Sequence, residues 1–125
     1  MLFVSGASAC GSTTTVPSTV RITNFVSRLQ EGGSAWRSIP VVTAGDVLVQ
    51  FTAITQTDAV MGLGLGTVNG TECVLNKSIQ TAANATTDAP QITSTLPVGT
   101  YCVKLFDIGN LTTIVDFTVV VTSPY

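Results

Sequence analysis

The sequence contains no histidine and carries little charge of either sign. Charged residues make up 10% of the chain, against about 25% in a typical soluble protein. Histidine is the commonest general base at neutral pH and the commonest metal ligand. Its absence removes the usual catalytic triads and most transition-metal sites, so we expect a chain that is not an enzyme.

Basic residues are few and scattered along the chain. The five cations are Arg21, Arg28, Arg37, Lys77 and Lys104, and the net charge is −2. They form no stripe that could neutralise a phosphate backbone and no polybasic segment that anionic lipid would attract. We therefore expect no nucleic-acid partner.

Long hydrophobic runs and helical periodicity are missing as well. No stretch reaches the roughly 18–20 apolar residues that a membrane span requires. Apolar and polar residues instead alternate with a period of two, and turn residues such as Asn69-Gly70 separate the alternating runs. This pattern predicts about eight short strands in an all-β, antiparallel β-sandwich, with a small barrel as the alternative.

The three cysteines include two with matching surroundings. Cys73 lies in GTECVL and Cys102 in GTYCVK, and both contexts predict a strand that begins just after a turn. If these two strands lie side by side, the thiols can form a disulfide that closes a loop of about 30 residues and contributes roughly 3–4 kcal/mol. Two buried free thiols are the alternative.

Cys10 follows a run of small residues, in MLFVSGASACGS. Ala7-Ser8-Ala9 fits a secretory cleavage site, and the segment also resembles a bacterial lipobox, in which the cysteine is lipidated. Because no basic residue precedes the short apolar stretch, we expect the true start to lie upstream. Residues 1–9 are then a signal-peptide remnant, Cys10 the lipidation site, 10–18 a polar linker and 19–125 the folded domain. The ordinary N-terminus of a cytosolic protein is the alternative.

Several segments resemble bacterial pre-peptidase C-terminal domains. Residues 36–49 (WRSIPVVTAGDVLV) resemble the beginning of that family's pattern, 96–107 (LPVGTYCVKLFD) its Gly-Thr-Tyr strand, and 116–121 (DFTVVV) its closing strand. The resemblance covers residues 34–122. It implies a secreted, jelly-roll-like sandwich of a kind usually appended to peptidases or surface proteins.

Calcium is the one cofactor that this resemblance implies. Some members of the family bind it, and residues 58–63 (DAVMGL) stand where the family has an acidic motif, so Asp58 becomes a candidate ligand. Calcium takes six to eight oxygen ligands, whereas the other aspartates are spread along the sequence. We therefore expect no cofactor, with calcium at Asp58 left open.

Two further features are candidates for binding. Gly62, Gly64 and Gly66 alternate along one strand without the spacing or the helix of a dinucleotide fingerprint. They predict the close approach of another backbone or a large side chain, or a flat face for a partner. Trp36 is the only tryptophan; it is either a core residue or an exposed ring that stacks on sugars.

These features support three hypotheses for the function. The first is an exported binding or adhesion module, extracellular or in the bacterial cell envelope, whose partner is a surface polysaccharide or a protein and which meets the membrane only through its N-terminal lipid. The second is a self-associating structural subunit, a homo-oligomer with poorly guarded sheet edges. The third is a calcium-stabilised accessory domain.

Overall fold

The computed structural model describes residues 19–125. The predicted signal remnant, the linker and the lipidation site at Cys10 lie outside the described residues. Eight strands make up the described chain: β1 (Val20–Leu29), β2 (Ser34–Val41), β3 (Gly45–Ile54), β4 (Val60–Asn69), β5 (Glu72–Ala82), β6 (Ile92–Leu96), β7 (Gly99–Asp107) and β8 (Val115–Pro124). No helix in this part of the chain is long and apolar enough to cross a bilayer.

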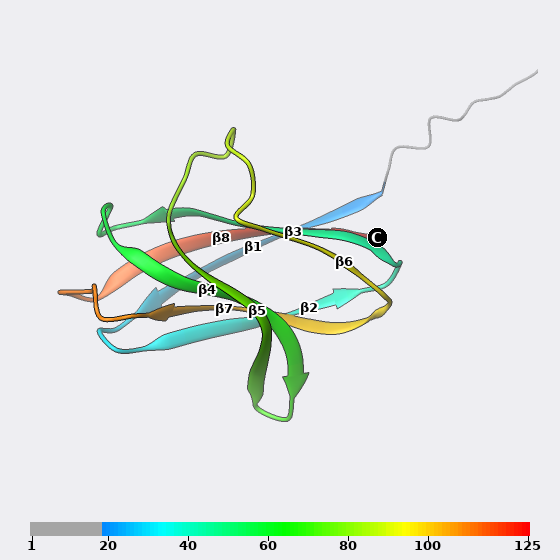
Figure 1. Cartoon of the computed structure of the whole chain (residues 1–125), viewed down its shortest axis with the longest axis horizontal. Coiled ribbons are helices and arrows are strands. Elements are labelled where there is room, and N and C mark those ends of the chain that lie inside the picture. The colour runs from blue at the N-terminus through cyan, green and yellow to red at the C-terminus, as the bar shows by residue number, and fades with distance from the viewer. Residues whose placement is uncertain (1–18) are drawn as a thin grey trace, which may run out of the picture.

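The strands form two four-stranded antiparallel sheets that pack face to face (Figure 1). Sheet A has the order β1-β8-β3-β6, and sheet B has the order β2-β7-β4-β5. The first strand pairs with the last, the second with the seventh, the third with the sixth and the fourth with the fifth. This nesting is the jelly-roll arrangement. The predicted all-β, jelly-roll-like sandwich is therefore confirmed, and the chain does not form a single closed barrel.

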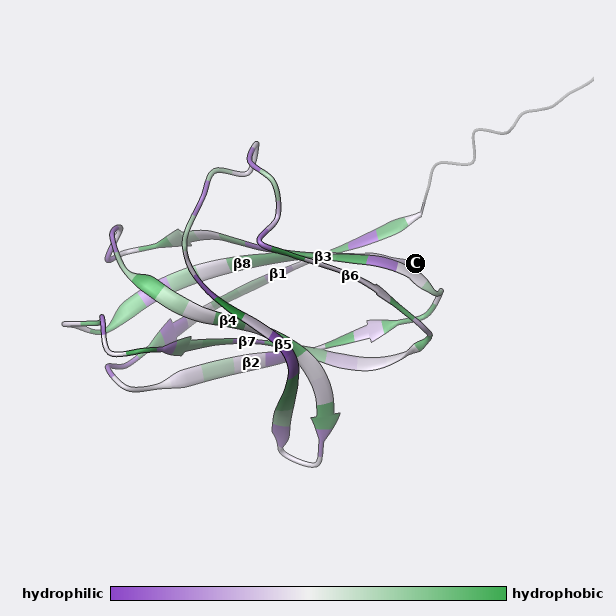
Figure 2. Cartoon of the chain, viewed as in Figure 1, coloured by the Kyte–Doolittle hydropathy of each residue, from purple (hydrophilic) through white to green (hydrophobic). Residues whose placement is uncertain are grey.

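The core lies between the sheets and follows from the period-two pattern. In β3 the buried residues include Val47, Val49 and Phe51, while the residues between them face outward. Phe117 of β8 meets Phe25 of β1 edge to face, with ring centroids 5.1 Å apart, a geometry that aromatic pairs favour. Figure 2 shows how much of the strands is green or pale, in keeping with the low charge of the sequence.

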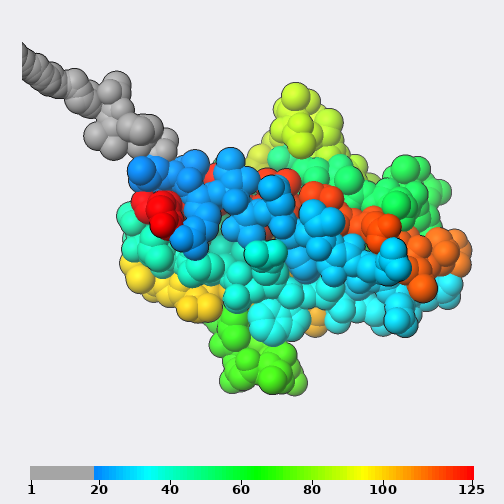
Figure 3. Space-filling view, turned by 180° about the vertical axis from the view of Figure 1, so that it is seen from behind, coloured from blue at the N-terminus to red at the C-terminus, as the bar shows by residue number. Residues whose placement is uncertain are grey.

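Two segments project beyond the sandwich on opposite sides (Figures 1 and 3). One is the tip of the β4–β5 hairpin, which turns at Asn69-Gly70 as predicted, with Gly70 at φ 65°. The other is the loop between β5 and β6, where Gln50 donates hydrogen bonds to Asn84 and Ala85. This loop begins only after Ala82, because Thr81 and Ala82 still pair with β4.

Candidate functional site

The outer face of sheet B is shaped by the three alternating glycines of β4. An added Cβ at Gly62 would clash with the ring of Phe106, and one at Gly64 would lie 2.5 Å from a methyl carbon of Leu75. At Gly66 it would clash with the main-chain carbonyl of Val74. The space beside each glycine is thus filled by a neighbouring side chain or by backbone, as the sequence predicted. The three glycines therefore do not form an open groove for a ligand.

The tip of the β4–β5 hairpin curls over this face because its register shifts. Leu65 pairs with Lys77 but Gly66 pairs with Leu75, so Asn76 is an extra residue on β5. Such a bulge bends the strand and increases its twist. The bend carries Val74 and Leu75 over Gly64 and Gly66 of β4, where a larger residue would block them.

The disulfide between Cys73 and Cys102 fastens the curled hairpin to β7. Their Cα atoms are 5.8 Å apart, and both residues are buried. The pairing predicted from the two matching contexts is confirmed. The two strands are not neighbours in the sheet, because β4 separates β5 from β7.

Gly66 explains how the bond spans an intervening strand. It pairs with Cys102 on one side and with Leu75 on the other. Strands two apart in a flat sheet are about 9.5 Å from one another, too far for a disulfide. The hairpin closes this gap by passing over Gly66, which has no side chain in the way.

Trp36 lies on the outer face of sheet B and not in the core. Ile39 and Val41 of β2 point inward, so alternation places Trp36 and Ser38 on the opposite side. The residue is half-buried and stands directly across from Lys104. It is thus held on a regular strand whose backbone is paired with β7.

Two residues of β7 complete the face around Trp36. The Lys104 ammonium nitrogen lies 5.9 Å from the centroid of the Phe106 ring, within the range of a cation–π contact. Ser34 pairs with Phe106 and Ser38 with Cys102, which places a hydroxyl on either side of Trp36. We call Ser34, Trp36, Ser38, Lys104 and Phe106 the sheet-B face.

The sheet-B face combines stacking surface with hydrogen-bonding groups. It offers an indole and a phenyl ring for apolar contact, two hydroxyls that both donate and accept, and one ammonium that donates. None of its five residues is a carboxylate, so the face itself provides neither a general base nor a calcium ligand.

The sequence singled out Trp36 but not Lys104 or Phe106. Their signal was present: Tyr101, Val103 and Leu105 alternate as inward residues, which leaves Lys104 and Phe106 on the outside. What the sequence could not supply was the pairing of β2 with β7, since that contact joins segments about 65 residues apart along the chain.

Asp58 lies exposed in the connection between β3 and β4. Residues 19–125 contain no cluster of three or more acidic, cysteine or histidine residues that could hold a metal ion. A calcium ion at Asp58 would therefore take most of its oxygen ligands from main-chain carbonyls, amides or water.

The chain was compared with protein-family models and with curated proteins, and nothing matches in either comparison. The resemblance of residues 34–122 to pre-peptidase C-terminal domains therefore stays a prediction.

Proposed function

We propose that the chain is a non-catalytic, exported binding module of the bacterial cell surface, and that it holds a surface polysaccharide on the sheet-B face. The observation that carries the proposal is the placement of the only tryptophan, half-exposed on a paired strand, between two serine hydroxyls and opposite Lys104. An indole that is not fully buried provides a flat apolar surface beside polar groups.

The chemistry of this face suits a sugar polymer. The C–H face of a pyranose ring can lie against Trp36, while the ring hydroxyls meet Ser34, Ser38 and the Lys104 ammonium. Groups fixed on strands are held more accurately than groups on loops. The residues are spread along two neighbouring strands, which fits an extended chain of sugars better than an isolated small molecule.

Export is supported by the disulfide. Disulfide bonds persist in oxidising compartments and are rare where thioredoxin and glutathione keep thiols reduced. Jelly rolls also occur in lectin domains, although a shared fold is an analogy and carries no function with it.

The lipid anchor is a separate part of the proposal. Expression behind a bacterial signal sequence, followed by intact-mass measurement, tests whether the product begins at Cys10 and carries acyl groups. A product that retains the residues before Cys10 and carries no lipid would remove the anchor from the proposal and leave the sheet-B face untouched.

Polysaccharide binding is tested by sedimentation with insoluble cell-wall polymers. Wild type and Trp36→Phe should bind, because both keep an aromatic ring, whereas Trp36→Ala should lose at least tenfold in affinity. Tyr125→Ala is a matched control, since Tyr125 is an exposed aromatic residue at the end of sheet A. Because Trp36 is the only tryptophan, intrinsic fluorescence reports binding at this position alone. Equal binding by Trp36→Ala and wild type would overturn the proposal.

A further inference from the structure

Strand β1 is an edge strand with one long unpaired side. It pairs with β8 through ten consecutive residues, from Val20 opposite Pro124 to Leu29 opposite Val115, without a register shift. Within residues 19–125, no strand pairs with its other side in sheet A. Figure 3 shows β1 (blue) running along the flank of the molecule next to β2 (cyan).

The main-chain groups that face this open side can be identified. Tyr125 donates its N–H to the carbonyl of Thr19 at 3.0 Å, so Thr19 faces β8. Successive residues of an antiparallel strand turn their N–H and C=O groups to opposite sides. The odd-numbered residues of β1 therefore bond to β8, and the even-numbered ones face the open edge: Val20, Ile22, Asn24, Val26 and Arg28.

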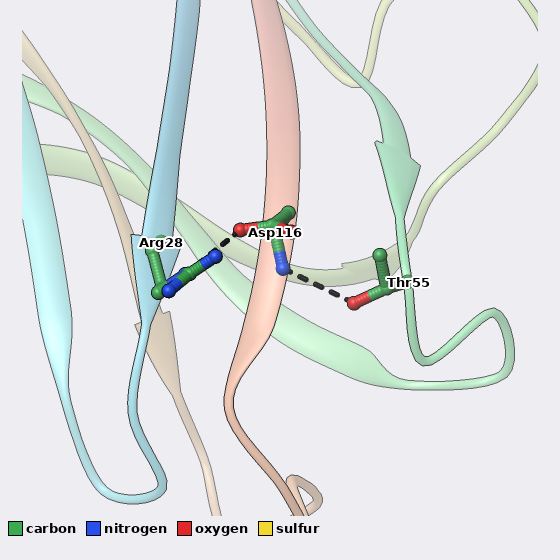
Figure 4. A network of polar contacts seen from close by, with 3 residues as sticks. All are labelled: Arg28, Thr55 and Asp116. Carbon is green, nitrogen blue, oxygen red and sulfur yellow. Dashed lines mark hydrogen bonds and ion pairs between the residues drawn. The ribbon is translucent and has the colours of Figure 1, made fainter.

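The other end of the ladder agrees with this assignment (Figure 4). Asp116 pairs with Arg28, yet its carbonyl accepts from the N–H of Thr55 at 3.0 Å and its N–H donates to the Thr55 hydroxyl at 3.1 Å. The main chain of Asp116 thus faces β3, as the alternation requires. The main-chain N–H and C=O of Arg28 are correspondingly turned away from β8, although its side chain reaches Asp116.

The other three edges each carry a feature that hinders pairing with another chain. Strand β6 has only five residues, and the Lys77 ammonium donates a hydrogen bond to the main-chain carbonyl of Thr93 at 3.0 Å. Strand β5 is bent by its bulge at Asn76. Strand β2 contains Pro40, which has no N–H to donate. Short strands, charged side chains, bulges and prolines are the usual protections of sheet edges. Strand β1 is ten residues long without a bulge or a proline, and its two arginines are engaged within the molecule, Arg28 by Asp116 and Arg21 by the ring of Tyr125.

The side chains along the open edge are apolar and exposed. Val20 is 50% exposed, Ile22 61% and Val26 63%. Isolated exposed apolar residues are ordinary, but here three of the four alternate residues from Val20 to Val26 are apolar and exposed on one face of the strand, and Asn24 is the fourth. The edge therefore combines free hydrogen-bonding groups with β-branched side chains that pack well across strands.

We propose that β1 pairs antiparallel with β1 of a second copy of this chain, around a two-fold axis at Asn24. Of the registers that place even-numbered residues opposite one another, only this one pairs all five even-numbered residues of β1 with those of the second copy. Val20 then faces the partner's Arg28, and Ile22 faces the partner's Val26. The two sheets A become one continuous sheet across the dimer.

Charge is compatible with this register. Arg21 stands opposite the partner's Ser27, and Arg28 opposite the partner's Val20, so the arginines of β1 never face each other. Arg28 also keeps its ion pair with Asp116, whose atoms lie 3.1 Å apart. Like charges directly opposite across strands would be destabilising.

The pairing is closed and independent of the proposed function. A two-fold contact uses both β1 edges and leaves none for a third copy. It involves sheet A, so the sheet-B face of each copy stays free. A dimer would present two such faces to a polymer, and it can form whether or not a polymer is bound.

Cysteine cross-linking tests the register. Every variant carries Cys10→Ser, so that the Cys10 thiol takes no part. Asn24→Cys should give a covalent dimer in a glutathione redox buffer, because directly opposite Cα atoms of a hydrogen-bonded pair are about 5.5 Å apart, within the span of a disulfide. Val26→Cys is the matched control on the same face. In the dimer, position 26 of one copy would lie four residues, about 13 Å along the strands, from position 26 of the other. This variant should therefore form no covalent dimer and should run as a monomer in a gel without reducing agent.

Proline at the same position tests the edge itself. Asn24→Pro removes an N–H that faces the open side and no hydrogen bond to β8, so the variant should fold and become monomeric. Ile22→Lys, which places a charge on the edge, should do the same if the proline variant does not fold. Asn24→Thr keeps the N–H and should dimerise like wild type.

Sedimentation gives the mass of the species in solution, which we compare with the chain mass of 12.9 kDa. We expect wild type to approach twice this mass as its concentration rises and to go no further. A wild type that stays monomeric at high micromolar concentration, one that grows beyond a dimer, or a folded Asn24→Pro that dimerises as well as wild type would overturn the proposal. So would equal cross-linking of Asn24→Cys and Val26→Cys.

Discussion

The side chain of Gln91 makes two hydrogen bonds to the main chain of Phe51. Its amide nitrogen donates to the Phe51 carbonyl at 2.9 Å, and its amide oxygen accepts from the Phe51 N–H at 3.0 Å. Pairing between β3 and β6 ends at Val49 and Ile92. The Gln91 carboxamide thus continues the hydrogen bonding between β3 and β6 by one further position, in place of the main chain of β6.

Gln91→Leu should destabilise the domain because it leaves the N–H of the fully buried Phe51 without a partner, while the Phe51 carbonyl still accepts from the Asn84 N–H at 3.0 Å. An unsatisfied buried donor or acceptor costs about 1–3 kcal/mol, so we expect a loss of that order in the free energy of unfolding, measured by urea denaturation. Gln80→Leu, at an exposed position of β5, is the control and should change little. Equal stability of the two variants would show that water replaces the carboxamide.

Gly66→Ala should be more destabilising than Gly62→Ala. At Gly66 the methyl group would clash with the main chain of Val74, which the adjacent disulfide holds in place. At Gly62 it would meet the ring of Phe106, a side chain that can turn outward. Overpacking typically costs about 1–3 kcal/mol, and we expect Gly66→Ala to exceed Gly62→Ala by at least about 1 kcal/mol.

Thiol titration gives this comparison a second measurement. If the hairpin of Gly66→Ala cannot close over β4, Cys73 and Cys102 should remain partly reactive in the purified protein. Complete disulfide formation together with wild-type stability would show that the hairpin moves aside at little cost.

Local patterns in the sequence were sufficient for the strands and the disulfide pair. Alternation with a period of two predicted the strands, Asn69-Gly70 marked a turn between two of them, and matching contexts linked Cys73 with Cys102. The strand order was not predictable, because β4 enters between the cysteine-bearing strands through long-range pairing. For the same reason, no local pattern indicated that Lys104 stands beside Trp36, or that β1 is left at an edge.

Loss of the disulfide should lower the free energy of unfolding by about 3–4 kcal/mol, since the bond closes a loop of 29 residues in the unfolded chain. The measurement is denaturation of the double variant Cys73→Ser, Cys102→Ser beside wild type. A reducing agent should bring wild type close to the double variant and leave the double variant unchanged. A double variant as stable as wild type would mean that Leu75 and the hairpin packing suffice without the bond.

The melting temperature should be the same in millimolar calcium and in chelator. A ligand that binds only the native state raises its stability, but the exposed Asp58 has no acidic cluster around it in residues 19–125. Asp58→Asn should likewise have the melting temperature of wild type in both buffers. A calcium-dependent rise that Asp58→Asn abolishes would instead establish Asp58 as a ligand and support the accessory-domain hypothesis.

Acid should weaken the domain partly through Asp107, which joins two loops at one end of the sandwich. Hydrogen bonds from main-chain N–H groups, first that of Gly32 and then those of Gly109, Leu111 and Asn110, hold the pKa of Asp107 below its ordinary value of 3.8, although partial desolvation opposes them. A carboxyl whose pKa is lower in the folded state stabilises the fold above its unfolded pKa. That contribution is lost as the pH falls from about 4 through the lowered pKa.

Asp107→Asn should therefore lower the urea midpoint at pH 7 and show a shallower loss of stability than wild type below about pH 4. One carboxylate oxygen accepts from Gly32 at 2.7 Å and the other from Gly109 and Asn110 at 2.8 and 2.9 Å. An asparagine must turn its NH₂ group toward one of these sets, so at least one N–H loses its acceptor. Asp58→Asn provides the comparison, because its carboxyl is exposed in another loop. If both variants follow wild type at every pH, Asp107 does not link the loops in solution.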